Sequence, residues 1–196
     1  EVSLSSSRSE FATAQSTFEK IEEIGYADAV GLTLLWRAAV AARLGLISRA
    51  VDSLEEFIET CTRPNGVNKQ YPGDREPAAD ILQIDANLAF AGVVNELFMQ
   101  WSDNTLNLLP SVPKNTTAQF WGWRTGGGHL VAMNVIKGKI EGLAIEATRS
   151  GVFNLVSPFP QSRLNFKLRQ KSKLLSRSVA NKKGKILTFD LKAGQR

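Results

Sequence analysis

Apolar side chains recur at spacings of three and four through the first part of the chain, a pattern that predicts helices with one buried face. Ser7 and Glu10 have the spacing of a capping box and predict the start of a first helix, which Gly25 is expected to end. Residues 27–44 are apolar nearly all round and predict a buried helix, whereas residues 47–61 predict an amphipathic one. Three successive helices are therefore expected.

A turn and a long polar segment separate these helices from a fourth. Residues 63–66 (RPNG) predict a turn, because proline fixes φ and glycine permits positive φ. Residues 67–84 form a polar connection of a length that is often functional. Residues 86–101 predict the last helix, and the order favours stacked helical hairpins. We expect this helix to bury Leu88, Val94, Leu97, Phe98 and Trp101.

Beyond the last helix the pattern changes from helical spacing toward alternation. Two prolines in residues 108–113 (LLPSVP) predict an extended, non-helical bridge. Alternation over 131–135, a hairpin turn at 136–140 and β-rich runs at 151–156 and 186–191 predict short strands. We therefore expect a helical part followed by a β module, as in small antiparallel sandwiches.

Composition narrows the chemistry that is open to the chain. Its 196 residues are 43% hydrophobic and 22% charged, which is typical of a globular protein. One cysteine, Cys61, excludes an internal disulfide and a multi-cysteine zinc site, and one histidine, His129, excludes a histidine-pair metal motif. We expect no metal and no cofactor. No apolar run approaches the ~20 residues that span a bilayer, so no membrane partner is expected.

Charge is distributed unevenly along the chain. Residues 161–196 hold 11 basic side chains and 1 acidic one, a balance of +10, whereas residues 1–160 hold 13 basic and 18 acidic ones, a balance of −5. A basic end can indicate nucleic acid or another polyanion. Its only aromatic residues are Phe166 and Phe189, and stacking on single strands needs more. We favour a solvated basic face without a nucleic-acid partner, and polyanion binding stays open.

Candidate chemistry lies where the polar connection meets the last helix, in residues 83–87 (QIDAN). Asp85 has the position of an N-cap that accepts the backbone N–H of Asn87 or Leu88. A carboxylate between the amides of Gln83 and Asn87 also suits a polyhydroxylated ligand, because each sugar hydroxyl both donates and accepts. Both interpretations remain open on the residues alone.

Residues 82–90 (LQIDANLAF), with the LLPSVP segment after them, resemble the end of the catalytic domain of glycoside hydrolase family 95. That family contains α-L-fucosidases and related α-L-galactosidases, and has a QIDxN run that opens a helix before an LLPALP segment. Residues 121–128 (WGWRTGGG) are similar to a following strand of the family, and residues 187–196 to its last strand. The resemblance is specific over 80–130 and near the C-terminus, and looser over the first 66 residues.

The resemblance implies an α+β multidomain fold class. Residues 1–108 are then expected to be the C-terminal portion of an α/α toroid catalytic domain made of helical hairpins, and residues 109–196 a small antiparallel β-sandwich domain. The upstream part of the same catalytic domain becomes a required partner. Because the chain begins at Glu1 rather than at a methionine, we expect a fragment without turnover of its own. A sequon at 115–117 (NTT) indicates an extracellular or secretory protein.

The resemblance also implies a reaction: inverting hydrolysis of terminal α-L-fucosyl or α-L-galactosyl residues of a glycan, without a cofactor. In such a reaction an acid protonates the leaving oxygen while a base activates water on the opposite face. In the family the acid is a Glu, and an Asn polarised by an Asp holds the water. That Asp matches Asp85, and Gln83 and Asn87 match motif positions that are expected to support substrate binding. The family's Glu and Asn pair lie upstream of this region.

A non-catalytic carbohydrate-binding or interdomain β module is the alternative to the enzyme. Trp121 and Trp123 are expected on one face of a strand, where they pack in a core or stack on sugar rings. His129 has no Ser or Cys partner pattern and is expected to be structural. Residues 126–128 (GGG) lack the context of a phosphate-binding loop and predict a bend or bulge.

Overall fold

The computed structural model describes residues 7–25, 29–71, 81–157, 168–170, 173–176, 181–183 and 186–194. The chain divides into two compact units, Glu1–Phe98 and Met99–Arg196. The division lies on the N-terminal side of the boundary expected after residue 108, because residues 99–108 form strands of the second unit. In the basic segment 161–196, residues 161–167, 171–172, 177–180, 184–185 and 195–196 lie outside the described residues.

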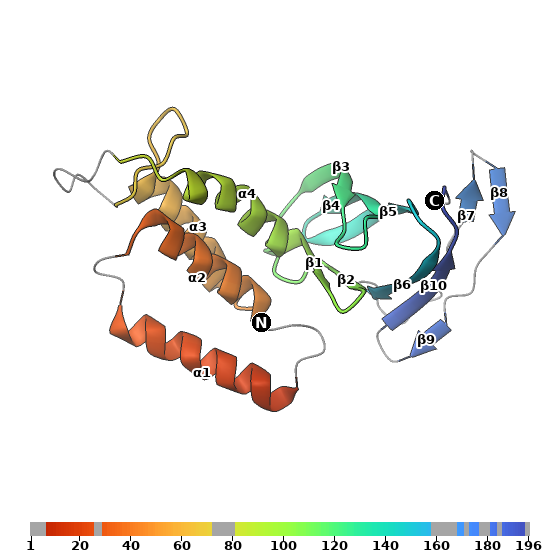
Figure 1. Ribbon diagram of the computed structural model, residues 1–196, viewed down its shortest axis with the longest axis horizontal. Coiled ribbons are helices and arrows are strands. Elements are labelled where there is room, and N and C mark those ends of the chain that lie inside the picture. Colours follow the sequence, from red (N-terminus) through yellow and green to blue (C-terminus); the bar gives the residue numbers. More distant parts are fainter. Residues whose placement is uncertain are drawn as a thin grey trace. The chain divides into compact units, whose positions relative to one another are not determined.

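Among its described residues the first unit contains four helices (Figure 1). They are α1 (Arg8–Ile24), α2 (Gly31–Arg43), α3 (Ile47–Cys61) and α4 (Ile84–Phe98). The predicted capping box is confirmed: the Ser7 hydroxyl accepts the Glu10 N–H and the Glu10 carboxylate accepts the Ser7 N–H. The predicted end at Gly25 and the turn at 63–66 are also confirmed.

Helix α2 is the centre of this unit because it packs against both α3 and α4. Small residues on α2 let the helices approach closely, and the rings of Phe57 on α3 and Phe90 on α4 stack with centroids 5.7 Å apart. The expectation that α2 is buried is right for one face, whereas its Trp36 is 55% exposed. The buried side chains of α2 and α3 are Leu34, Leu35, Ala38, Ala41, Ala42, Ala50, Ser53, Leu54, Phe57 and Cys61.

Ion pairs join the first three helices. The Arg37 guanidinium on α2 contacts the Glu22 carboxylate on α1 at 2.5 Å and the Glu56 carboxylate on α3 at 3.2 Å. Arg49 on α3 contacts the same Glu22 at 2.6 Å. The side chains of Arg37 and Glu22 are each 13% exposed, so this central pair is largely shielded from water, whereas Glu56 and Arg49 are 48% and 57% exposed. These ion pairs fix α1 against α2 and α3.

Two expectations for the fourth helix are wrong. The helix ends at Phe98, and Trp101 lies on strand β1 (Met99–Ser102) instead of in the helix. Leu88 was expected in the core but is 71% exposed. The buried residues of α4 are Ala86, Val93 and Leu97, and Leu88 lies on the opposite side of the helix from them.

The second unit consists of short strands (Figure 1). The mixed sheet has the order β1-β2-β6-β10-β9, in which β2 pairs parallel with β6 and the other neighbours are antiparallel. A second sheet has the order β3-β4-β5, and β7 pairs with β8. The bounds are β2 Thr105–Leu108, β3 Ala118–Arg124, β4 Leu130–Ile136, β5 Lys139–Glu146, β6 Gly151–Val156, β7 Leu168–Gln170, β8 Lys173–Ser176, β9 Asn181–Lys183 and β10 Ile186–Leu191. The predicted strands at 151–156 and 186–191 are therefore confirmed.

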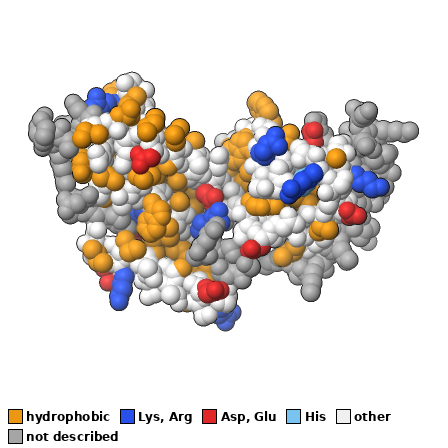
Figure 2. Space-filling view, viewed as in Figure 1, with side chains coloured by type: hydrophobic (Ala, Val, Ile, Leu, Met, Phe, Trp, Pro, Cys, Tyr) orange, Lys and Arg blue, Asp and Glu red, His pale blue; other side chains and the backbone are white. Residues whose placement is uncertain are grey.

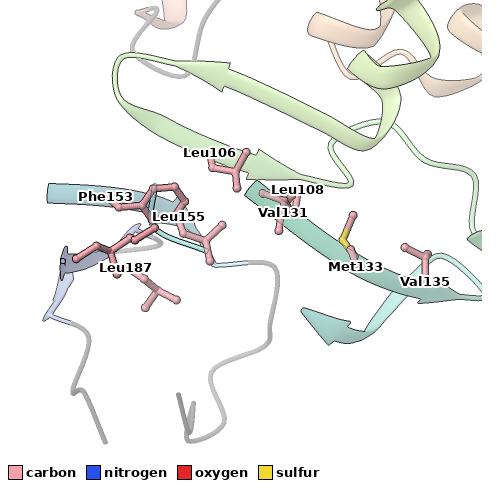
Figure 3. Packing of buried hydrophobic residues seen from close by; sticks show 10 residues of the cluster. Leu106, Leu108, Val131, Met133, Val135, Phe153, Leu155 and Leu187 are labelled. Atoms are coloured by element: carbon pink, nitrogen blue, oxygen red, sulfur yellow. The ribbon is translucent and has the colours of Figure 1, made fainter. Parts of the chain in front are cut away.

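Both main sheets contribute to one core (Figure 3). Val131, Met133 and Val135 alternate along β4 and point into it, as their spacing predicts. The predicted hairpin turn between β4 and β5 is confirmed, with Lys137 and Gly138 at φ of 50° and 68°. The other core residues are Leu106, Leu108, Ala147, Phe153, Leu155, Leu187 and Leu191. The described residues thus form an α+β chain, four helices followed by two small sheets, and no closed toroid.

Candidate functional site

Asp85 is the second residue of α4 and its side chain is exposed. The helix begins at Ile84, two residues earlier than an N-cap role for Asp85 requires, and the N–H groups of Ala86 and Asn87 donate to the backbone carbonyl of Gln83 at 3.2 and 3.3 Å. The expected capping of Asn87 or Leu88 by Asp85 is therefore wrong. Asp85 Oδ1 instead accepts the adjacent Ala86 N–H at 3.0 Å.

The Gln83 side chain caps a different helix. Its Oε1 accepts the backbone N–H of Leu32 at 3.0 Å, in the first turn of α2. Val30, the N-cap of α2, provides no side-chain hydrogen bond of its own, so Gln83 takes over this function from a distant part of the chain. Gly31 makes room for this contact, because a Cβ there would lie 3.2 Å from Gln83 Oε1.

The Asn87 side chain is likewise bonded to the backbone of another segment. Its Oδ1 accepts the Asn68 N–H at 2.9 Å and its Nδ2 donates to the Gly66 carbonyl at 2.9 Å. Both ends of the amide are therefore used to hold the turn after α3 against α4. Asn87 is thus a scaffold residue in this structure, and so is Gln83.

The polar connection between α3 and α4 is closed at its base by backbone pairing. Lys69 and Leu82 form a β-bridge, and the Gln70 N–H donates to the Ile81 carbonyl at 2.8 Å. The Gln70 carbonyl in turn accepts the Gly31 N–H at 2.8 Å. These paired residues, 69–70 with 81–82, form a neck. The second half of the neck ends three residues before Asp85. Residues 72–80 lie outside the described part of the chain.

Asn68 is a candidate that the sequence analysis missed. Its side chain is 1% exposed, and its Oδ1 has no hydrogen-bond partner among the described residues. A buried, unsatisfied amide oxygen is costly and marks a position where a ligand or water is held. The only sequence signal is its place in the polar connection, where many other polar residues also lie.

Large apolar side chains surround Asp85 on the surface. Ile81, Leu82, Ile84 and Leu88 are 52%, 54%, 59% and 71% exposed. Figure 2 shows hydrophobic side chains over the surface of the helical unit in this view. A run of exposed apolar residues beside a carboxylate is unusual for a free surface, and typical of a face that another element covers.

His129, in the second unit, is a further residue singled out from the sequence. His129 is 4% exposed, and its ring meets Phe153 edge-on with centroids 5.3 Å apart. Burial, and then the charge of Arg149, lower the pKa of His129. Its Nδ1 has no hydrogen-bond partner in the described part of the chain, and neither does the nearby Thr125 Oγ1. The expected structural role of His129 agrees with this packing.

The expectation that Trp121 and Trp123 share one face of a strand is wrong. Phe120 pairs with Met133 and Trp123 with Val131, so the register of β3 shifts between them. The shift is a β-bulge at Trp121 and Gly122, where Gly122 has φ +73°. Trp123 therefore stacks on Phe120 with centroids 4.0 Å apart, whereas Trp121 is 74% exposed.

Within the described ranges no group of three or more His, Cys, Asp or Glu is placed to hold a metal ion. The helices described here are too short or too polar to cross a membrane. No protein-family model matches the chain, and no curated protein matches it.

Proposed function

We propose that the chain is part of an inverting glycoside hydrolase that resembles family 95 and acts on terminal α-L-fucosyl or α-L-galactosyl residues. One observation carries the proposal. Of the three polar residues of the motif, Gln83 and Asn87 are bonded to distant backbone, whereas Asp85 bonds only its own neighbour Ala86 among the described residues. The fold thus holds the first turn of α4 from both sides and leaves the carboxylate between them available.

In the proposed mechanism the Asp85 carboxylate orients an amide side chain that holds the attacking water. An amide is a poor base, so the negative charge of the carboxylate is what makes removal of the water proton feasible. A Glu acid protonates the leaving oxygen on the opposite face. We place the acid and the amide in an upstream part of the same catalytic domain. The reaction requires no cofactor.

The exposed apolar surface around Asp85 supports the proposal that another structural element packs there. Ile84 and Leu88 lie on the same side of α4, one turn apart, and both are more than half exposed. Further helical hairpins of a toroid packed there would cover these residues and enclose Asp85. Water around the carboxylate would be excluded, which strengthens its interaction with a polarised amide.

The test is made in the longer protein that includes the upstream sequence. Asp85→Asn is expected to lower kcat on an aryl α-L-fucoside or α-L-galactoside by about 100-fold or more, since it removes the charge and keeps the shape. Asp52→Asn, an exposed acid on α3, is the matched control and is expected to leave kcat unchanged. Product NMR should show inverted configuration at the anomeric carbon. Activity of Asp85→Asn within a few-fold of the parent contradicts the proposed role.

The 196-residue chain itself provides a second test of the split site. It should show no turnover of the same substrates, because the acid and the amide lie elsewhere. Turnover by this chain would overturn the assignment of the acid to an upstream part, even if Asp85 proved essential.

We also propose that the protein is secreted. Asn115, in the sequon, is exposed in a turn before β3, where a glycosyltransferase can reach it. Expression through a eukaryotic secretory pathway should add one N-glycan that an amidase removes, and Asn115→Gln should abolish the mobility shift. An unmodified Asn115 under those conditions contradicts this support for secretion.

A further inference from the structure

The outward face of the β3-β4-β5 sheet has one large exposed aromatic residue. Trp121 is 74% exposed and makes no ring contact with another described residue. Trp121 follows the inward Phe120 by one residue and faces outward by alternation, whereas the bulge after it turns Trp123 to the inner face beside Phe120. The bulge thus leaves Trp121 as a single exposed indole on this face, and a large exposed apolar ring is typical of a contact site.

The register shows what lies beside the indole. Trp121 and Gly122 lie opposite Ala132 in the bulge, and Ala132 pairs with Ala144 on β5. Residues directly opposite each other share a face, so the row next to Trp121 has only methyl side chains. The side chains beside the indole are therefore small, which leaves room for a flat ring above them.

The next row across the sheet is polar. Gln119 on β3 pairs with Asn134 on β4, and Asn134 pairs with Gly142 on β5. Neither amide side chain has a hydrogen-bond partner among the described residues. Two adjacent amides thus present donors and acceptors two residues along the strand from the indole, about 7 Å away on the same face.

Charges on this sheet cancel. Arg124 and Lys139 are balanced by Glu141 and Glu146, and Arg124 also donates to the Gly128 carbonyl at 3.0 Å. A polyanion is favoured by a surface of one positive sign, which this face lacks. A protein partner needs a buried area of about 800 Å² on each side with several apolar anchors. This face offers one aromatic ring beside alanine and glycine, with Ile136, 42% exposed, at the end of β4.

We infer that this face, with Trp121, Gln119 and Asn134 as its contact residues, is a binding site for a neutral pyranose ring of a glycan. One face of a pyranose carries C–H groups that pack on an indole, while its hydroxyls both donate and accept. The ring packs on Trp121 over Ala132 and Ala144, and the hydroxyls at its edge bond the two amides. This site belongs to the β unit and does not depend on Asp85 or on hydrolysis.

The test follows the indole N–H signals of the four tryptophans in the full 196-residue chain by NMR. Probes are methyl α-L-fucopyranoside, methyl β-D-galactopyranoside and methyl β-D-glucopyranoside, at concentrations up to the order of 100 mM. We expect at least one of them to shift the Trp121 signal with a dissociation constant on the order of millimolar, and to leave the signal of Trp123 on the inner face nearly unmoved. Absence of a Trp121 shift with all three sugars overturns the inference.

Variants separate this site from any other. Trp121→Ala should lose binding by about tenfold or more, and because its side chain is exposed the fold should be retained. Trp36→Ala removes another exposed tryptophan, on α2, and this variant should bind the sugars as the parent does. Gln119→Ala with Asn134→Ala should weaken binding several-fold with Trp121 intact.

Unchanged affinity in Trp121→Ala, or binding of heparin with no response to the neutral sugars, contradicts the proposal. Asp85→Asn should bind normally, so a failure here is distinct from a failure of the proposed hydrolase.

Discussion

The Gln83 side-chain oxygen accepts the backbone N–H of Leu32 at 3.0 Å, across 51 positions of the chain. The first turn of α2 is thereby fixed to the residue that precedes α4. Since Asp85 follows two residues later, the position of the candidate carboxylate depends on a capping interaction that neither helix contains within its own sequence.

Gln83→Ala should destabilise the helical unit by about 1–2 kcal/mol, because the N–H of Leu32 loses its partner at a partly buried helix end. Urea unfolding followed by far-UV circular dichroism measures the change. Gln119→Ala, on an exposed position of β3, is the control and should alter stability by less than about 0.5 kcal/mol. Equal effects of the two substitutions would argue against the capping role.

Two glycines in helices should respond in opposite directions to the same substitution. Gly31→Ala brings a Cβ to 3.0 Å from Phe57 Cε2 and 3.2 Å from Gln83 Oε1, so we expect a loss of about 1–3 kcal/mol. Gly92→Ala meets nothing within 4 Å on the exposed side of α4 and should gain about 0.5–1 kcal/mol. Thermal unfolding measures the change in stability of both variants. A Gly31→Ala variant more stable than the parent would contradict the close packing of α2 against Gln83.

The two neighbouring residues of the motif should separate into scaffold and site. Asn87→Ala removes partners of the Asn68 N–H and the Gly66 carbonyl and should cost about 2–3 kcal/mol. Asp85→Asn keeps a side-chain oxygen in an exposed position and should cost less than about 1 kcal/mol. Denaturant midpoints of both variants provide the comparison. If Asp85→Asn were the more destabilising, the carboxylate would have a structural role instead of a functional one.

Stability of the β unit should fall in mild acid because of His129. Its pKa in the folded chain lies below the ordinary value of 6.5, so the neutral form is favoured in the fold. Above pH 6.5 both states are neutral and the full stability is present; as pH falls below 6.5 the unfolded state takes up a proton first and stability is lost until the folded pKa is reached. Chemical denaturation followed by tryptophan fluorescence between pH 7.5 and about 5 measures this loss.

His129→Asn is the control for that experiment. The variant lacks the edge contact with Phe153 and should be less stable at every pH, but the part of the pH dependence above the range of the carboxylates should vanish. A pH profile that is the same in the parent and in the variant would assign the effect to other groups.

Local patterns predicted much of the fold. The helices from Ser7 to Cys61, the turn after them and the strands at 151–156 and 186–191 all have their signals within a short stretch of sequence. The hairpin of β1 and β2 also has a local signal in the sequence, the dipeptide Asp103-Asn104 in its turn. Both residues have positive φ, a conformation that Asp and Asn tolerate well. The hairpin was missed because the apolar spacing of α4 continues to Trp101 and hides the change of structure.

Contacts between distant segments account for what the sequence could not predict. The burial of Leu88 depends on which helices pack against α4, and periodicity alone assigns an apolar residue to the core. The separation of Trp121 and Trp123 onto opposite faces depends on one extra residue in β3, because a one-residue shift moves a side chain to the other face. The local pattern singles out residues 83–87, whereas the scaffold roles of Gln83 and Asn87 involve segments that no local pattern connects.

The parallel pairing of β2 with β6, and the place of β10 beside β6, have a consequence for how the protein is made. On the ribosome β1 to β6 emerge before β10, which is an inner strand of the mixed sheet. Until Ile186–Leu191 arrives, one side of β6 is an open edge, and Phe153 and Leu155 are without the strand that covers them. A nascent or truncated chain that stops before β10 should therefore be prone to aggregation and to recognition by chaperones.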